Sequence, residues 1–220
     1  MPRPLKIALA LFAGFVALAT GLYAALFQLD VRPRLGFAPG FALTAADGNA
    51  LTSDDLRGGI TVYTFDHTGN DDAARGTSPV LRAVKTALAT ADTAGVPVRF
   101  VTVAFDGPPP ERLQAATAAA GADGWTWATG PPDVLRRTVR DGFGAYYERA
   151  PDGTYLFDPT FVVVDGLGIV RARYRLGLPR PEALVADVRS LVREAQSAEG
   201  TLGLAYEAAH LFSCYSVASP

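Results

Sequence analysis

The first 28 residues have the hydrophobic pattern of a membrane anchor. Residues 7–27 form a run of 21 residues without a charged side chain, and Arg3 and Lys6 precede this run. A helix of this length is roughly 30 Å long, which matches the hydrocarbon core of a bilayer. Because positive residues favour the cytoplasmic side, the pattern predicts a single-pass anchor with a cytoplasmic N-terminus. Arg32 and Arg34 follow closely and weaken this asymmetry.

Two other interpretations of the run stay open. A cleaved signal peptide usually has an apolar core of about 7–15 residues, whereas this run is longer and no small-residue cleavage motif closes it before Gln28. A buried helix of a globular domain is less favoured, because the run is apolar on all faces. With an uncleaved anchor, the rest of the chain is expected outside the cytoplasm, on the periplasmic side of the cell membrane.

Residues 29–40 contain two prolines and two glycines and predict a linker, after which two kinds of apolar pattern alternate through residues 41–196. Runs of β-branched and aromatic residues predict strands, and apolar residues at helical spacing predict helices. The predicted strands are 41–43, 60–65, 98–105, 125–128, 161–165 and 169–176. The predicted helices are 79–94, one that begins at Pro110, 131–139 and 181–195, and residues 66–78 are predicted as a loop.

This order of elements predicts an α/β fold. Alternating strands and helices favour a largely parallel sheet that is covered on both faces, and Gly166 and Gly168 indicate a closing antiparallel hairpin. Such an arrangement is a thioredoxin-like sandwich, a central mixed sheet between helices, here preceded by one transmembrane helix. Residues 197–220 lie beyond the sandwich and are expected to form a C-terminal extension with a short apolar helix.

Composition and charge exclude several classes of function. The net charge is −2 and no basic block is present, which argues against nucleic-acid binding. The chain has one cysteine, Cys214, and two histidines, His67 and His210. One cysteine cannot form an intrachain disulfide or supply a four-cysteine or two-cysteine, two-histidine zinc site. We therefore expect no dithiol oxidoreductase activity and assign no catalytic residue.

Five short motifs occur in a characteristic order. They are FAL and DG with DLRG within 41–58, VYTFDHT at 62–68, VAFDGPPPERL at 103–113, WATG at 127–130, and the strand that ends at Asp165. In this order they resemble the SCO/SenC family, the membrane-anchored thioredoxin-like proteins that deliver copper to cytochrome oxidase. The resemblance extends to about Val192 and implies the thioredoxin-like fold and a role near a respiratory complex.

The resemblance also implies a copper site, and this sequence lacks the ligands. Family members bind copper through a Cys-x-x-x-Cys loop after the first central strand and a histidine before the hairpin, and their thiols can exchange disulfides. The two cysteines align with Asn70 and Ala74, and the histidine aligns with Phe157. We therefore predict no metal ligand and no cofactor at these positions. Phe157 is expected to fill the vacated site and pack against the loop at 66–75.

A different cation could still use the loop. Asp66, His67, Asp71 and Asp72 are residue types that bind zinc or a harder cation. A solvated loop that kept polar residues explains the same pattern more simply, with His67 packed or partly exposed.

The C-terminal extension offers a second alternative site. His210 and Cys214 are four residues apart, so on a helix they would share one face. With His67 they would form a relocated copper site if the extension folds back across the loop. The simpler interpretation is a helix that packs on the domain with Cys214 as a small apolar side chain, and the lone thiol could also pair with another chain.

Together these patterns predict a membrane-anchored SCO/SenC-like protein with a degenerate copper and redox site. We expect a binding, accessory or assembly factor for a respiratory complex of the cytochrome oxidase type, with that complex or its assembly factors as partners. The alternative is a metallochaperone that uses His67, His210 and Cys214.

Overall fold

The computed structural model describes residues 3–7, 11–16, 32–69, 77–93, 95–121 and 125–197. Residues 32–196 form one compact unit, and residues 1–31 together with 197–220 belong to a second unit. The sheet and its helices lie in the compact unit, which is called the domain below.

The domain contains every strand and helix that the sequence predicts, with some changes of length. Its strands are β1 (Gly36–Phe37), β2 (Ala42–Ala45), β3 (Ala50–Thr52), β4 (Ile60–Asp66), β5 (Val98–Ala104), β6 (Thr126–Thr129), β7 (Tyr147–Arg149), β8 (Tyr155–Phe157), β9 (Phe161–Val164) and β10 (Ile169–Tyr174). Its helices are α2 (Thr77–Ala89), α3 (Pro110–Ala119), α4 (Pro132–Leu135), α5 (Pro181–Ser197), the short 3-10 helix η1 (Asp54–Leu56) and the π-helical η2 (Arg136–Gly142).

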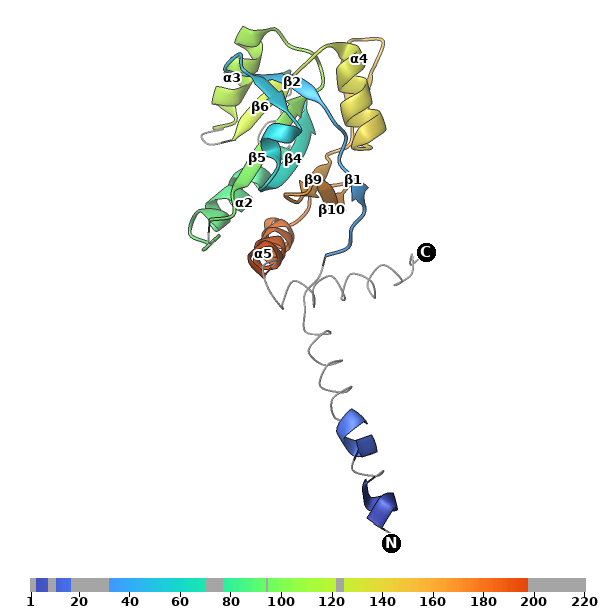
Figure 1. Cartoon of the computed structure of the whole chain (residues 1–220). Helices are drawn as coiled ribbons and strands as arrows, with labels where there is room; N and C mark the ends of the chain where they lie inside the picture. The colour runs from blue at the N-terminus through green and yellow to red at the C-terminus, as the bar shows by residue number, and fades with distance from the viewer. Residues whose placement is uncertain are drawn as a thin grey trace. The chain divides into compact units, whose positions relative to one another are not determined.

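The main sheet has the strand order β1-β10-β9-β4-β5-β6-β2-β3. Strands β4, β5 and β6 run parallel, whereas β9, β10 and β2 pair with their neighbours antiparallel. Figure 1 shows α2, α3 and α5 on one side of this sheet and α4 on the other. The predicted mixed sheet between two layers of helices, closed by the β9–β10 hairpin, is therefore confirmed.

Two hydrophobic clusters fill the two faces of the sheet and explain the continuous apolar run in β4. Ile60 and Val62 point into one cluster, and Tyr63 and Phe65 point into the other. A central strand that is buried on both faces has no polar side to alternate with. The helical residues that close the clusters are Leu81, Leu113 and Leu184 on the first face and Leu135 and Val139 on the second.

Three predicted helices differ in extent from the structure, and α5 differs least because it ends at Ser197 rather than at 195. Helix α2 ends at Ala89 rather than at 94, because Thr90, Asp92 and Gly95 favour turns and Gly95 adopts a φ of +83°. The helix predicted at 131–139 continues as η2 to Gly142, where the Phe143 N–H donates to the Thr138 carbonyl at 2.9 Å. A Cβ at Gly142 would lie 2.5 Å from Pro39, so only glycine permits this close approach.

The segment expected to be a linker takes part in the sheet. β1 pairs with β10, and the Leu35 N–H donates to the Val170 carbonyl at 2.8 Å. Buried Arg171 also donates to the carbonyls of Arg32 and Pro33. The compact unit therefore begins at Arg32, nine residues before the position expected from the sequence.

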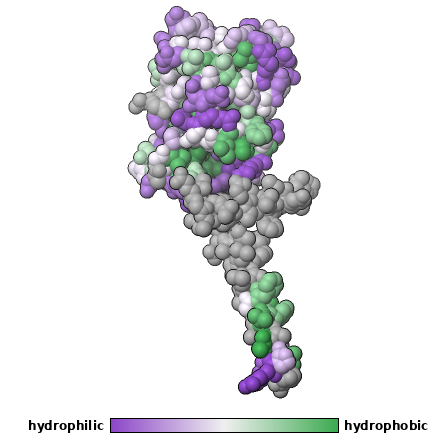
Figure 2. Space-filling view, viewed as in Figure 1, coloured by the Kyte–Doolittle hydropathy of each residue, from purple (hydrophilic) through white to green (hydrophobic). Residues whose placement is uncertain are grey.

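Residues 3–7 and 11–16 are helical, and Figure 2 colours them largely hydrophobic with hydrophilic atoms at the N-terminal end. In the part of the chain that the structure describes, no helix combines the length and the apolar character needed to cross a bilayer. Most of the anchor predicted at 7–27, and residues 198–220 of the predicted extension, lie outside the described residues.

Candidate functional site

The loop that follows β4 is held at both ends by Asp66. The His67 backbone N–H donates to Asp66 Oδ1 at 2.8 Å, and the Thr77 hydroxyl at the start of α2 donates to Asp66 Oδ2 at 3.0 Å. Asp66 is 4% exposed. Two charge-assisted hydrogen bonds to a buried carboxylate thus join the end of a central strand to the helix that follows it.

A second carboxylate positions the residue after His67. Asp106 follows β5, and its Oδ2 accepts hydrogen bonds from the backbone N–H and the hydroxyl of Thr68, at 3.1 and 2.6 Å. Asp106 Oδ1 is buried and has no hydrogen-bond partner among the described residues. Because β4 and β5 are parallel neighbours, their carboxyl ends bring Asp66 and Asp106 to the same edge of the sheet.

The imidazole of His67 lies in a group of rings that we call the aromatic cluster. Its centroid is 5.9 Å from that of Phe105, 5.3 Å from Tyr155 and 5.4 Å from Phe157. Phe105 also stacks on Tyr147, with centroids 4.6 Å apart and 18° between the planes. The aromatic cluster is therefore His67, Phe105, Tyr147, Tyr155 and Phe157, held together by the tilted, stacked and edge contacts that aromatic rings prefer.

Three rings of the aromatic cluster come from the β7–β8 hairpin, which the sequence analysis did not predict. Tyr147 pairs with Phe157 across the hairpin, and Arg149 pairs with Tyr155. The sequence did carry a signal, because Pro151, Asp152 and Gly153 form a strong turn motif between two tyrosine-containing runs. Gly153 adopts a φ of +88°, as this turn requires.

Burial changes the acidity of the tyrosine that stacks on Phe105. Removal from water raises the pKa of Tyr147 above its usual value of 10.0, and the neighbouring Tyr155 raises it further, while Arg140 and Arg136 act in the opposite direction. The raised pKa reflects a phenol that is partly removed from water where its ring stacks on Phe105.

A polar pocket of about 530 Å³ lies beside the aromatic cluster. It is lined by His67, Gly69, Asp106, Arg112, Arg149, Asp152, Gly153, Thr154 and Tyr155. Two arginines and two aspartates share this lining with one imidazole. Such a set suits hydrogen bonds and ion pairs to a polar polypeptide segment better than it suits a soft metal ion.

The donor set at this end of the sheet does not fit a copper(I) site. Copper(I) prefers thiolate, thioether and imidazole ligands, and the aromatic cluster supplies one imidazole and two phenols. No group of three or more histidine, cysteine or acidic side chains in metal-binding proximity occurs among the described residues. Asn70, Asp71, Asp72 and Ala74 lie outside those residues.

The structure places Phe157 where the sequence analysis expected it, half-buried and against His67 of the loop. His67 is half-buried, as expected for a packed or partly exposed histidine. His210 and Cys214 lie outside the described residues, so the relocated site that would join them to His67 stays a prediction.

The family model for SCO1/SenC matches residues 30–193. The chain belongs to the SCO1/SenC family. The matched range covers the whole main sheet, helices α2, α3 and α4 and most of α5. It also includes the aromatic cluster. A comparison with curated proteins gave no match.

Solved structures of SCO1/SenC proteins share this fold. A SCO1/SenC family lipoprotein from Bacillus anthracis is 23% identical, with 73% of this chain and 98% of that chain covered and a TM-score of 0.61. Arabidopsis thaliana ScoI with copper bound is 18% identical, with coverage of 72% and 99% and a TM-score of 0.63. BsSco, described with a disulfide switch, is 18% identical, with coverage of 74% and 98% and a TM-score of 0.63. At these identities the likeness establishes the thioredoxin-like fold.

Proposed function

We propose that this chain is a membrane-anchored SCO1/SenC protein that has exchanged the copper and redox site for a binding surface. It acts as an accessory or assembly factor for a respiratory complex of the cytochrome oxidase type, and it does not catalyse dithiol exchange. BsSco is described as a member of the Sco family of cytochrome c oxidase assembly proteins, which supports this choice of partner.

The contact between Phe157 and His67 supports this function most directly. Phe157 stands where the family resemblance places a copper-binding histidine, and its ring packs edge-on against the imidazole. The single cysteine of the chain, Cys214, lies 57 residues further along the sequence. A half-buried phenylalanine at a ligand position supplies packing and excludes water, and it has no nitrogen or sulfur lone pair with which to coordinate copper(I).

Exposed apolar side chains beside the aromatic cluster support a role in protein binding. Leu156 on β8 is 58% exposed, and Leu176, after β10, is 91% exposed. Asp158 holds this region together, because its carboxylate accepts the Leu176 N–H at 3.0 Å and its own N–H donates to the Tyr146 carbonyl.

Leu176 is also held in a strained conformation. Its φ of +63° is the only positive φ of a non-glycine residue in the described part of the domain. Such a conformation costs roughly 1–2 kcal/mol, and the Asp158 carboxylate offsets part of this cost. The strain presents an apolar side chain to solvent next to the aromatic cluster, as expected of a contact residue.

The membrane anchor is part of the proposal. The uncharged run at 7–27 is long enough to span, and the related Bacillus anthracis protein is a lipoprotein. The full chain should stay in the membrane fraction after washing with alkaline carbonate. A soluble species that begins near residues 24–30 would show a cleaved signal peptide instead.

Deletion of the chain in its own cells, with and without added copper, tests the proposed role. We expect lower oxidase activity after deletion and no rescue by copper, since the chain does not deliver the metal. Leu156→Glu combined with Leu176→Glu should fail to complement, whereas Ala83→Glu on the exposed face of α2 should complement fully. Rescue of the deletion by copper alone would favour the metallochaperone alternative.

A further inference from the structure

One edge of the domain presents large apolar side chains to solvent close to the start of the compact unit. Leu35 is 54% exposed and Phe37 is 82% exposed, and both flank Gly36 on the edge strand β1. Leu167, in the β9–β10 turn, is 65% exposed. We call these three residues the β1 patch. The Ala38 N–H donates to the Gly168 carbonyl at 2.9 Å, which brings the turn and the edge strand side by side.

Arg171 fastens the segment that enters this edge to the rest of the domain. Arg171 is 3% exposed, and its guanidinium pairs with Asp165 at 2.8 Å and with Glu194 of α5 at 2.7 Å. The same guanidinium donates to the Arg32 carbonyl at 2.7 Å, and the Arg32 side chain pairs with Asp187 of α5 at 2.9 Å. Residue 32 is therefore part of the folded domain and not of a loose tether.

The distance along the chain from residue 32 to the hydrophobic run is short. Only residues 28–31 separate Phe27, the end of the uncharged run, from Arg32. Five backbone steps extend over at most about 18 Å. If residues 7–27 span a bilayer, this short connection keeps Arg32 within about 18 Å of it, which is close to the radius of gyration of roughly 15 Å expected for a domain of this size.

We propose that the β1 patch docks on the lipid bilayer, with Leu35, Phe37 and Leu167 inserted into the headgroup layer. The proposal rests on the anchor put forward above as part of the function. Apolar and aromatic side chains gain free energy at this boundary, where one side of the residue meets lipid and the other stays wet.

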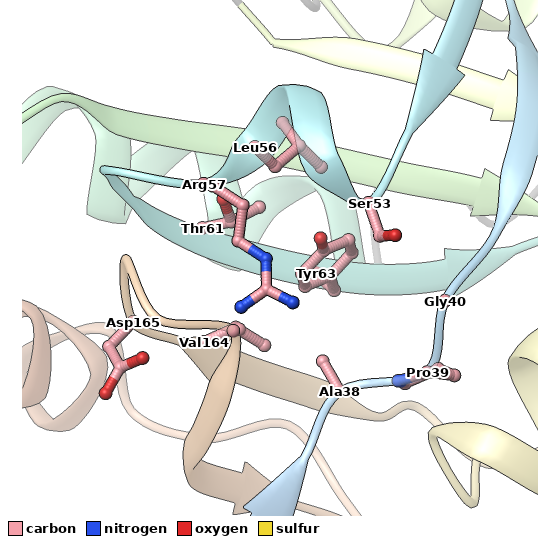
Figure 3. Close-up of a pocket in the computed structure, with 11 residues that line it drawn as sticks. Ala38, Pro39, Gly40, Ser53, Leu56, Arg57, Thr61, Tyr63, Val164 and Asp165 are labelled. Carbon is pink, nitrogen blue, oxygen red and sulfur yellow. The ribbon is translucent and has the colours of Figure 1, made fainter.

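A cation lies at the rim of the β1 patch. Arg57 follows η1, and its guanidinium donates a hydrogen bond to the Leu167 carbonyl. Figure 3 shows Arg57 extended toward the β9–β10 turn, opposite Ala38 on the entering chain. The Arg57 side chain is 50% exposed, and its ion pair with Asp54 at 3.8 Å is long and solvated. It can therefore contact a lipid phosphate while the neighbouring leucine inserts.

Depth-dependent fluorescence of the full chain in vesicles tests the docking. In a Cys214→Ser background, a single cysteine at Phe37→Cys or Leu167→Cys is labelled with an environment-sensitive fluorophore. Leu156→Cys on β8 is the matched control, because its exposure is close to that of Leu167. The chain is reconstituted into phosphatidylcholine and phosphatidylglycerol vesicles, and nitroxide-labelled lipid is used as quencher. We expect emission at shorter wavelength and severalfold stronger quenching at positions 37 and 167 than at 156.

A second substitution distinguishes insertion of the β1 patch from a fluorophore that is merely close to the membrane. With the fluorophore at position 167, the further substitution Phe37→Glu should lower quenching to the level of position 156. If the chain floats with the vesicles and quenching is equal at positions 37, 156 and 167, the docking is wrong but the anchor stands. Emission at shorter wavelength from position 37 without quenching by nitroxide-labelled lipid would also overturn the docking. It would show that a second copy of the chain, and not lipid, covers the β1 edge. A chain that does not float with the vesicles contradicts the anchor itself, and the docking with it.

Discussion

The ring of Phe157 meets the imidazole of His67 edge-on, with centroids 5.4 Å apart and 87° between the ring planes. His67 directly follows β4 and Phe157 is the last residue of β8, so the contact joins the loop to the hairpin. In the family that this sequence resembles, the corresponding loop carries the two cysteines of a copper site and the corresponding strand carries its histidine. Here the same juxtaposition is made by ring packing.

Phe157→His tests the packing role of this side chain. The substitution removes an apolar ring from the aromatic cluster and places an imidazole next to His67 without a designed partner. We expect a loss of about 1–3 kcal/mol in the free energy of unfolding. Urea unfolding followed by the fluorescence of the buried Trp125 and Trp127 measures it. Leu156→His, at an exposed site on the same strand, should change stability by less than about 0.5 kcal/mol. A neutral or stabilising Phe157→His would mean that position 157 faces solvent.

Arg171→Met tests the buried ion pairs that fasten the start of the domain. The change leaves Asp165 and Glu194 without their cation and removes the donor to the Arg32 carbonyl. Breaking a buried pair on one side costs about 3–5 kcal/mol, and we expect a loss of that size in urea unfolding. Arg189→Met on the exposed side of α5 is the control and should be near neutral. Equal effects of the two substitutions would contradict the assigned role of Arg171.

Asp152 gives the hairpin a defined dependence on pH. Hydrogen bonds from the hydroxyl and the backbone N–H of Thr154 lower the pKa of Asp152 below its usual 3.8. Because the folded pKa is the lower one, this stabilisation is present above the unfolded pKa and is lost as pH falls through the folded pKa. Asp152→Asn should therefore be less stable than the parent chain at pH 7, and the gap should narrow below about pH 4. A stability difference between the two chains that stays constant from pH 7 to pH 3 would show that ionisation of Asp152 does not produce it.

Much of the fold follows from the local sequence pattern. The remaining parts of the fold are determined by tertiary contacts. Ile60–Asp66 is recognisable because every residue is apolar, β-branched or aromatic until the terminal aspartate. β1 is only two residues long and exposed, so its place in the sheet depends on hydrogen bonds from β10 that no local pattern encodes. Part of the aromatic cluster is likewise predictable from the sequence. The alignment of Phe157 and the position of His67 follow from the motifs, whereas the rings of Tyr147 and Phe105 meet only after the hairpin folds over the end of β5.

Disulfide reduction is expected to be absent. The chain has only one cysteine, so it cannot pass through the dithiol and disulfide forms that catalytic reduction requires. Insulin precipitation in the presence of dithiothreitol should proceed at the uncatalysed rate, both for the parent chain and for Cys214→Ser. Turnover that disappears in Cys214→Ser would contradict the proposal, and turnover that persists would indicate a contaminating enzyme.

We propose that the aromatic cluster occupies the place of the family's copper site and binds no copper itself. Titration of the full chain with copper(I) under reducing conditions, in competition with a chromophoric copper(I) chelator, measures this directly. Tight copper(I) binding needs two or three soft ligands held together. We expect the chelator to keep its copper at equimolar protein, with the same curve for His67→Ala as for the parent chain. Stoichiometric removal of copper from the chelator, lost in His67→Ala or in Cys214→Ser, would contradict the account and establish a relocated metal site.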